Sequence, residues 1–446
     1  MANESFALNL APARTTDGPF FRPNLAGIGF TIFLLLVFVG LEPFAPRADV
    51  STFGGVAQGN AQGDMLRQIT YVGAFGLIML AILMRQGMAA IRAVPLSIAL
   101  LLGWCLASML WAAQPEVVIR RAGLEVIIVL SVFFGIEALG TARAFAIFKW
   151  LLLAVLVINC LSIPVIPAAR HFATEIDTAL IGNWRGLYGH KNIAGAVSAI
   201  TALIFLFGRH GKGNWIGILV ALAATLFLVM SQSKSSLGFL PIAAAAGLAY
   251  RYSWKDGLSR AILLVATVLL LLGMGLATLF YADEISRLLS DPREFTGRSA
   301  IWAAELAYIR DHPFLGHGFG TFADTGGLSP LHGYVNDNWV ETVSHGHNGY
   351  LQLLVTIGGI GFALAMAALV LSPLRRFWRL AQDDSRSLFF ALFVFVVLHN
   401  MMESDFLEGD VVSWTTMLLV IAMLRNSERS AEGGRNGPVD REARPA

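Results

Sequence analysis

The feature that most constrains the fold is a series of apolar runs that recurs from one end of the chain to the other. Of the 446 residues, 56% are hydrophobic and only 14% are charged. About 17–25 apolar residues suffice for a helix to cross a bilayer, and in lipid only helices and closed barrels satisfy every backbone polar group. Because the runs are continuous rather than alternating, we expect an all-α polytopic membrane protein.

Twelve runs predict about 12 transmembrane helices. Their expected bounds are 25–41, 69–84, 94–112, 122–139, 147–163, 192–207, 215–231, 237–250, 261–281, 348–371, 388–402 and 411–424. A long polar segment separates the ninth run from the tenth. The sequence therefore predicts one large loop between spans 9 and 10.

The basic residues predict the orientation of these helices, since cytoplasmic loops are enriched in Lys and Arg. With the N-terminus inside, the inner loops carry a basic residue at about one position in four and the outer loops at about one in twelve. Both termini are therefore expected in the cytoplasm and the large loop in the periplasm. The expected order is a cytoplasmic tail (1–24), spans 1–9 (25–281), the periplasmic loop (282–347), spans 10–12 (348–424) and a disordered cytoplasmic tail (425–446).

Charge and cysteine content argue against two other classes. The formal net charge is +2 and the basic residues show no clustering of the kind found in nucleic-acid-binding proteins, so we expect no nucleic-acid partner. Cys105 and Cys160 both fall inside apolar runs, where cysteine behaves as a small apolar residue. They predict neither a disulfide nor a metal site.

Seven basic residues in the predicted outer loops are unusual, because charges near the membrane interface are costly unless paired. They are Arg120 and Arg121 in the second outer loop, Arg185 and Lys191 in the third, Lys234 in the fourth, and Arg293 and Arg298 in the fifth. The planar fork of arginine suits bidentate phosphate contacts, so a lipid-linked diphosphate is one candidate counter-charge. The alternative is that these side chains reach lipid headgroups or pair with nearby carboxylates.

Two of these residues lie in a dense motif, Asn183–Asn192, which reads NWRGLYGHKN. Tyr188 offers an aromatic surface to a sugar or lipid, and His190, Lys191 and Asn192 lead directly into a predicted span. Lys234 belongs to a tight outer turn, SQSKSS at 231–236. Its hydroxyls either cap the flanking helices or contact substrate.

The large loop holds five of the nine histidines. Its segment 296–311 has helical periodicity and contains Arg298 and Trp302, which predicts an amphipathic helix that lies on the bundle or the interface. Pro313 and three glycines, at 316, 318 and 320, are expected to end it.

His347 stands at the mouth of the tenth span, directly before Asn348, and could act as a general base near neutral pH. His345 is the alternative, and Glu341 is a reserve base. A metal site built from His317, Asp337, His345 and His347 lacks zinc-like spacing, so we expect no metal and no other cofactor. His399, deep in a span, is expected to hydrogen-bond between helices.

Together these motifs resemble the bacterial O-antigen ligase and Wzy-type polysaccharide polymerase superfamily. The matching elements are Arg185 with YGHKN at 188–192, the turn 231–236, GRSAIW at 297–302, PFLGHGFGTF at 313–322, and His347-Asn348 followed nine residues later by Gly358 and Gly361. The last is similar to the ligase-type histidine signature. The resemblance covers roughly residues 100–424.

This resemblance implies a membrane glycosyltransferase of the bacterial inner membrane, with a saccharide on undecaprenyl diphosphate as donor. Transfer would be metal-independent and inverting. Arg185 and Arg298 would clamp the diphosphate and offset charge on the leaving group, and His347 would orient or deprotonate the acceptor hydroxyl. Secondary substrate contacts would come from Tyr188, His190, Lys191, Asn192, Lys234, Trp302 and Asn348.

The family contains two activities that share this signature. A polymerase joins lipid-linked repeat units of exopolysaccharide or O-antigen, whereas a ligase passes finished polymer to lipid A–core. We favour the polymerase, with the flippase and chain-length regulator of the same pathway as partners. A lipid-linked oligosaccharide flippase is a third class, but transporters place charged sites near the midplane, whereas here the ionisable residues crowd one face.

Overall fold

The chain is described by a computed structural model over residues 24–45, 65–172, 178–208, 215–253, 298–323, 329–334, 346–379 and 384–435. Across these residues the regular structure is helical, and an isolated antiparallel bridge joins Arg170 to Trp184. The class predicted from the sequence, an all-α protein, is thereby confirmed.

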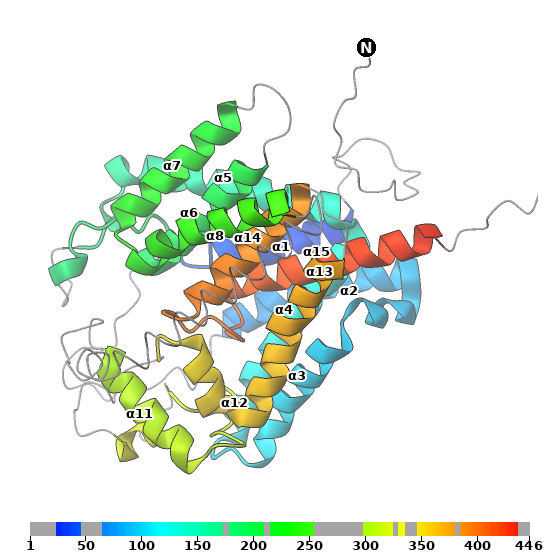
Figure 1. Ribbon diagram of the computed structural model, residues 1–446, viewed down its shortest axis with the longest axis vertical. Helices are drawn as coiled ribbons and strands as arrows, with labels where there is room; N and C mark the ends of the chain where they lie inside the picture. Colours follow the sequence, from blue (N-terminus) through cyan, green and yellow to red (C-terminus); the bar gives the residue numbers. More distant parts are fainter. Residues whose placement is uncertain are drawn as a thin grey trace, which may run out of the picture.

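The α-helices pack into one bundle (Figure 1). They are α1 (Leu25–Phe38), α2 (Met65–Gln86), α3 (Leu96–Ala107), α4 (Pro115–Leu139), α5 (Thr141–Val165), α6 (Lys191–Phe207), α7 (Trp215–Ser231), α8 (Lys234–Ser253), α11 (Arg298–Asp311), α12 (Gly349–Ala365), α13 (Ser372–Arg379), α14 (Asp384–His399) and α15 (Val412–Arg435). A π-helical turn, Met366–Leu371, joins α12 to α13.

Four helical stretches in the described part of the chain are long and apolar enough to cross a membrane. They are Met65–Gln86, Pro115–Leu139, Thr141–Val165 and Gly349–Arg379. Five shorter apolar helices also coincide with predicted spans. The expected span 261–281 lies outside the described residues, so the count of twelve stays a prediction.

Several helices extend beyond the apolar runs that predicted them. Helix α4 begins at Pro115, so Arg120 and Arg121 lie in its first turns and not in a loop. A proline at the first helical position favours this early start, because it lacks the N–H that would go unbonded there. Arg121 then donates to the carbonyl of Gly320, 2.6 Å away, and joins α4 to the large loop.

The C-terminal tail begins later than expected. Helix α15 continues to Arg435, so residues 425–435 are helical where a disordered tail was predicted. Two ion pairs fix these turns: Arg429 meets Glu137 of α4 at 2.8 Å, and Glu428 meets Arg376 of α13 at 3.2 Å. Pairing with other helices stabilises a polar segment that would not be helical alone.

The amphipathic helix predicted in the large loop is α11. It packs on α12 through a small apolar cluster that includes Ala304, Tyr308 and Val355, and Figure 1 shows both helices at one end of the molecule. After α11 the chain crosses α12 at Gly358, which has φ 67°. A Cβ there would overlap the carbonyl of Phe314, so only glycine permits this close crossing.

Candidate functional site

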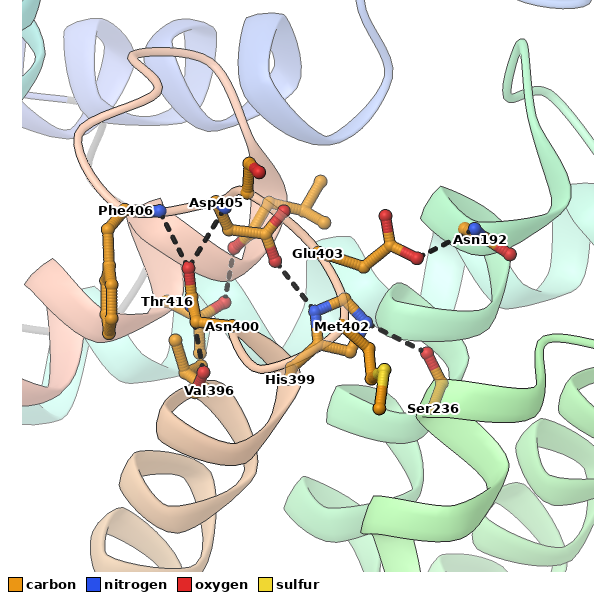
Figure 2. Close-up of polar contacts among 12 residues, drawn as sticks. Asn192, Ser236, Val396, His399, Asn400, Met402, Glu403, Asp405, Phe406 and Thr416 are labelled. Atoms are coloured by element: carbon orange, nitrogen blue, oxygen red, sulfur yellow. Dashed lines mark hydrogen bonds and ion pairs between the residues drawn. The ribbon is translucent and has the colours of Figure 1, made fainter. Parts of the chain in front are cut away.

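The polar residues of three separate segments meet at Glu403, in the turn after α14. This carboxylate accepts hydrogen bonds or ion pairs from Asn192 Nδ2 (2.8 Å to Oε1), Arg298 Nη2 (3.0 Å to Oε1) and His347 Nδ1 (3.3 Å to Oε2). Figure 2 shows the contact with Asn192. The Glu403 side chain is 11% exposed, so a nearly dry carboxylate links the three segments.

Hydrogen bonds from residues before and after Glu403 fix the turn that presents it. Met402 and Glu403 both donate their N–H groups to the carbonyl of His399, each at 3.0 Å, which ends α14. The Asn400 side chain accepts from the N–H groups of Asp405 and Phe406 (Figure 2). The backbone conformation at Glu403 is therefore set by bonds within its own turn.

Residues 347–350 bind directly to this turn. Gly349 donates to the carbonyls of Asn400 and Glu403 at 2.8 and 2.9 Å, and Asn348 N donates to Ser404 Oγ at 3.0 Å. The Asn348 side chain also caps α12 by accepting from Tyr350 N and Leu351 N. Asn348, a predicted substrate contact, thus anchors the segment that carries His347.

His347 adopts a left-handed backbone conformation, with φ 52°. A histidine there costs conformational energy that the surrounding contacts must offset. Its side chain is 29% exposed. Since a carboxylate only accepts hydrogen bonds, Glu403 favours the tautomer with the proton on Nδ1 and the lone pair on Nε2.

Arg298 is the first residue of α11 and lies against the opposite oxygen of the same carboxylate. Besides the ion pair with Glu403 Oε1, its Nη1 donates to the carbonyl of Met402. The side chain is 13% exposed. The structure thus brings together Arg298 and His347, which are predicted catalytic residues from the two ends of the large loop.

Neighbouring groups keep the Glu403 carboxyl ionised. Burial alone raises the pKa of this carboxyl, but the hydrogen bond with His347 and the positive charge of Arg298 outweigh it and lower the pKa to about 2. Glu403 is consequently ionised at neutral pH and offsets the positive charge of Arg298.

A second hydrogen-bond chain lies beside the first. His399 Nδ1 is 2.7 Å from Asp405 Oδ2, and His399 Nε2 is 3.2 Å from Ser236 Oγ of α8 (Figure 2). All three residues are buried. The predicted helix–helix hydrogen bond of His399 is confirmed, and it ties the Ser/Lys turn to the segment that carries Glu403.

A buried carboxyl on α11 lies behind the His347 segment. Glu305 is 1% exposed, and a Cβ on Gly346 would overlap its side chain. Burial raises the pKa of Glu305 to about 8, so it is protonated at neutral pH. Trp302, one turn earlier, donates from Nε1 to the carbonyl of Gly346 at 2.8 Å, so α11 holds this segment by two side chains.

Arg185 is the predicted residue that the structure places differently. It is fully buried, and its guanidinium donates to the carbonyls of Ala45, Gly189 and Phe44 at 3.3, 3.2 and 3.4 Å. These bonds hold its own loop against the segment after α1. The predicted diphosphate contact of Arg185 stays a prediction.

The other residues of that motif support the start of α6. Tyr188 is buried and donates to the carbonyl of Phe38 at 2.9 Å. His190 caps α6 by accepting from Asn192 N, and Lys191 N donates to His171. Lys234 is the exposed first residue of α8. The two reserve bases, Glu341 and His345, lie outside the described residues.

Within the described ranges, no group of three or more His, Cys, Asp or Glu side chains is arranged to hold a metal ion. Asp337 and His345, two members of the alternative metal set, lie outside these ranges. Metal independence therefore stays a prediction.

Glu403 is the residue that sequence reasoning missed. Its only local signal is a carboxylate that directly follows an apolar run, in the segment HNMMESD at 399–405. A buried charge at the edge of a span indicates a partner in another segment, but its partners at 192, 298 and 347 cannot be read from that local pattern.

The fold and the site define a helical membrane protein in which ionisable side chains from several segments meet at one end of the bundle. Residues 197–366 match the family model described as O-antigen ligase. This match supports the O-antigen ligase and Wzy superfamily and confirms the resemblance found in the sequence. The chain matches no curated protein.

The matched region runs from α6 through α12 and includes Lys234, Arg298, Trp302, His347 and Asn348. Glu403 lies beyond it. The match supports a part for this protein in surface polysaccharide biosynthesis of the ligase or polymerase type.

Proposed function

We propose that this protein is a glycosyltransferase of the bacterial inner membrane that takes a saccharide from undecaprenyl diphosphate. The acceptor is a sugar hydroxyl at the periplasmic face. Transfer inverts the anomeric configuration and requires no metal ion. Both termini of the protein are cytoplasmic. The observation that carries the proposal is the convergence of Arg298 and His347 on Glu403. It supplies a general base and a phosphate-binding cation around one positioning carboxylate.

In the proposed step, His347 Nε2 accepts the proton of the acceptor hydroxyl. The hydroxyl oxygen bonds to the anomeric carbon on the face opposite the diphosphate, and the bond from that carbon to the diphosphate oxygen breaks. The electron pair leaves with undecaprenyl diphosphate, whose growing charge Arg298 stabilises. Since this is a single displacement, the anomeric configuration inverts.

Glu403 has two positioning functions in this scheme. It orients His347 and stabilises the imidazolium that forms when the proton is transferred. It also holds the Arg298 side chain in place before substrate arrives. Lys191 and Lys234 are proposed as further phosphate contacts, with His190, Asn192 and Trp302 lining the approach of the saccharide.

We favour polymerisation of exopolysaccharide or O-antigen repeat units, with transfer of finished polymer to lipid A–core as the alternative. The two activities use the same donor chemistry and differ in the acceptor. The experiment is therefore a deletion strain complemented with wild type, Arg298→Ala or His347→Ala, followed by analysis of its surface polysaccharides.

Two exposed residues of the same loop provide matched controls. Arg310→Ala removes an arginine from the far end of α11, and His332→Ala removes a histidine of the loop. Both variants should make normal polysaccharide, whereas Arg298→Ala and His347→Ala should not. Equal membrane abundance of all four variants, measured by immunoblot, separates lost activity from lost protein.

The products distinguish the activities. Single repeat units on lipid A–core or on the carrier indicate a polymerase, and full-length polymer stranded on the carrier indicates a ligase. Normal polymer in cells that carry His347→Ala would contradict the assigned base.

A further inference from the structure

A cluster of arginines lies at the other end of the bundle from Glu403. Helix α15 begins beside the Glu403 turn and reaches Arg425 after roughly 20 Å of helix, at 1.5 Å per residue. The C-terminal end of α4 lies at the same level, because Glu137 pairs with Arg429. In Figure 1 the C-terminal part of α15 lies beside α2, away from α11.

This cluster contains more positive than negative charge. Arg85, Arg92, Arg376, Arg425 and Arg429 supply the cations, and Glu137 and Glu428 supply the carboxylates. The two carboxylates are taken by Arg429 and Arg376, at 2.8 and 3.2 Å. Like charges held this closely repel each other unless an anion joins them.

Arg425 takes part in neither of these two ion pairs. Its Nη2 donates to the carbonyl of Arg92 at 2.8 Å. Its Nε is buried and has no hydrogen-bond partner among the residues that the structure describes. A buried N–H of a charged group without an acceptor is costly, and an anionic oxygen at this position would remove that cost.

A cavity of about 750 Å³ opens beside these arginines. Its polar wall is formed by Arg92, Arg425, Glu428 and Arg429, and its apolar wall by Ile91, Val94, Leu96 and Ala99. Leu96 is 73% exposed and Ile91 58% exposed. Arginines on one wall and open aliphatic surface on the other fit a ligand with an anionic head and a hydrocarbon tail.

We propose that this cavity binds an anionic glycerophospholipid. Its phosphate contacts Arg92 and Arg425, and an acyl chain lies along Ile91, Leu96 and Ala99. Basic pockets between transmembrane helices bind such headgroups, and the bound phosphate would bridge α15 to the segment before α3. The inference is independent of the glycosyl transfer proposed above, because it uses no residue of that site.

The test measures lipid binding to the purified full-length protein in detergent by native mass spectrometry and thermal unfolding. The probes are dioleoyl phosphatidylglycerol, dioleoyl phosphatidylcholine and inorganic phosphate. We expect phosphatidylglycerol to stay bound and to raise the unfolding temperature. Phosphatidylcholine, which has the same chains, and phosphate should do neither.

Variants locate the site. Arg92→Ala and Arg425→Ala should each weaken phosphatidylglycerol binding roughly fivefold, equivalent to about 1 kcal/mol for a basic residue near an anionic lipid. Arg425→Lys should restore part of the binding, and Arg310→Ala, at the other end of the molecule, should leave it unchanged. The comparison of phosphatidylglycerol with phosphatidylcholine uses wild-type protein, so it tests the proposal even when a variant fails to fold.

Three results would overturn the proposal. Equal stabilisation by the two phospholipids would mean that the headgroup charge is not recognised. Phosphate binding with the same dependence on Arg92 and Arg425 would indicate a site for free anions. Undiminished phosphatidylglycerol binding to the Arg92→Ala/Arg425→Ala variant would place the lipid elsewhere.

Discussion

His347 Nδ1 lies 3.3 Å from Glu403 Oε2, although the two residues are 56 positions apart in the sequence. The other oxygen of the same carboxylate binds Arg298. One side chain therefore sets the distance and orientation between the proposed base and the proposed phosphate ligand. A neutral side chain of the same size in place of Glu403 should disturb the positions of His347 and Arg298 without leaving a cavity.

Glu403→Gln should leave the fold intact and reduce the rate of transfer. Glutamine keeps the size of the side chain but cannot stabilise an imidazolium, and general-base assistance contributes about 100-fold or more to such reactions. We expect kcat to fall by at least about tenfold with little change in KM for the donor. The assay is transfer by the purified protein from a lipid-linked saccharide.

Asp410→Asn is the matched control for that substitution. Asp410 lies a few residues after Glu403 and pairs with Arg67 at the surface, where both side chains are more than a third exposed. Such pairs contribute little to stability. A similar loss of kcat in both variants would mean that Glu403 has no specific role.

The stability that Glu403 contributes should depend on pH. Its pKa in the folded protein is about 2, below the ordinary value of 4.5. The ionised carboxylate therefore contributes its full stability above about pH 4.5, and this contribution declines as the pH falls toward 2. The difference in unfolding temperature between wild type and Glu403→Gln should shrink from pH 7 to pH 3.

Glu305 should show the opposite dependence. Burial raises its pKa to about 8, so its contribution to stability is complete below about pH 4.5 and is lost as the pH rises through 8. Glu305→Gln, which mimics the protonated acid, should match the wild type at pH 5 and unfold at a higher temperature than wild type at pH 9. A variant that is less stable at pH 9 would contradict a neutral Glu305.

Gly358→Ala should prevent the close crossing between α12 and the chain after α11. At φ 67° and ψ −177° a residue other than glycine is strained by about 1–3 kcal/mol, and its Cβ would also overlap the carbonyl of Phe314. We expect a lower unfolding temperature and loss of transfer. Gly103→Ala, in an open position on α3, should be neutral or stabilising, since alanine favours helix.

Substitution by lysine should have different effects on stability and activity at Arg185 and at Arg298. Lysine cannot reach the three carbonyls that Arg185 binds, and each buried carbonyl left unpaired costs about 1–3 kcal/mol. Arg185→Lys should therefore lower folded yield and unfolding temperature. Arg298→Lys, at a partly exposed position, should fold normally and lose activity. A stable but inactive Arg185→Lys would instead favour a direct phosphate contact.

Much of this arrangement could be predicted from local pattern. Eleven of the twelve predicted spans coincide with described helices, because a long apolar run in lipid has no other way to satisfy its backbone. The helix at Arg298–Asp311 was predicted from periodicity within a few residues. Short motifs that keep their spacing indicate His347 and Arg298 as candidate site residues.

The roles of individual residues within those motifs are harder to predict from the sequence. Arg185 and Tyr188 belong to a motif that predicts substrate contact, yet both are buried and bind backbone carbonyls. A motif specifies which side chains are near each other. It does not specify whether a guanidinium faces a ligand or the interior, because that depends on which other segments pack against it.

The sequence by itself determined the class of the protein, its helices and the segments that carry ionisable groups, since these follow from hydropathy and local periodicity. Only the tertiary structure decided that Asn192, Arg298 and His347 share the carboxylate of Glu403. The physical reason is that a buried charge is stable only beside its partners. Those partners come from segments that meet only after α6, α11, α12 and α14 have packed.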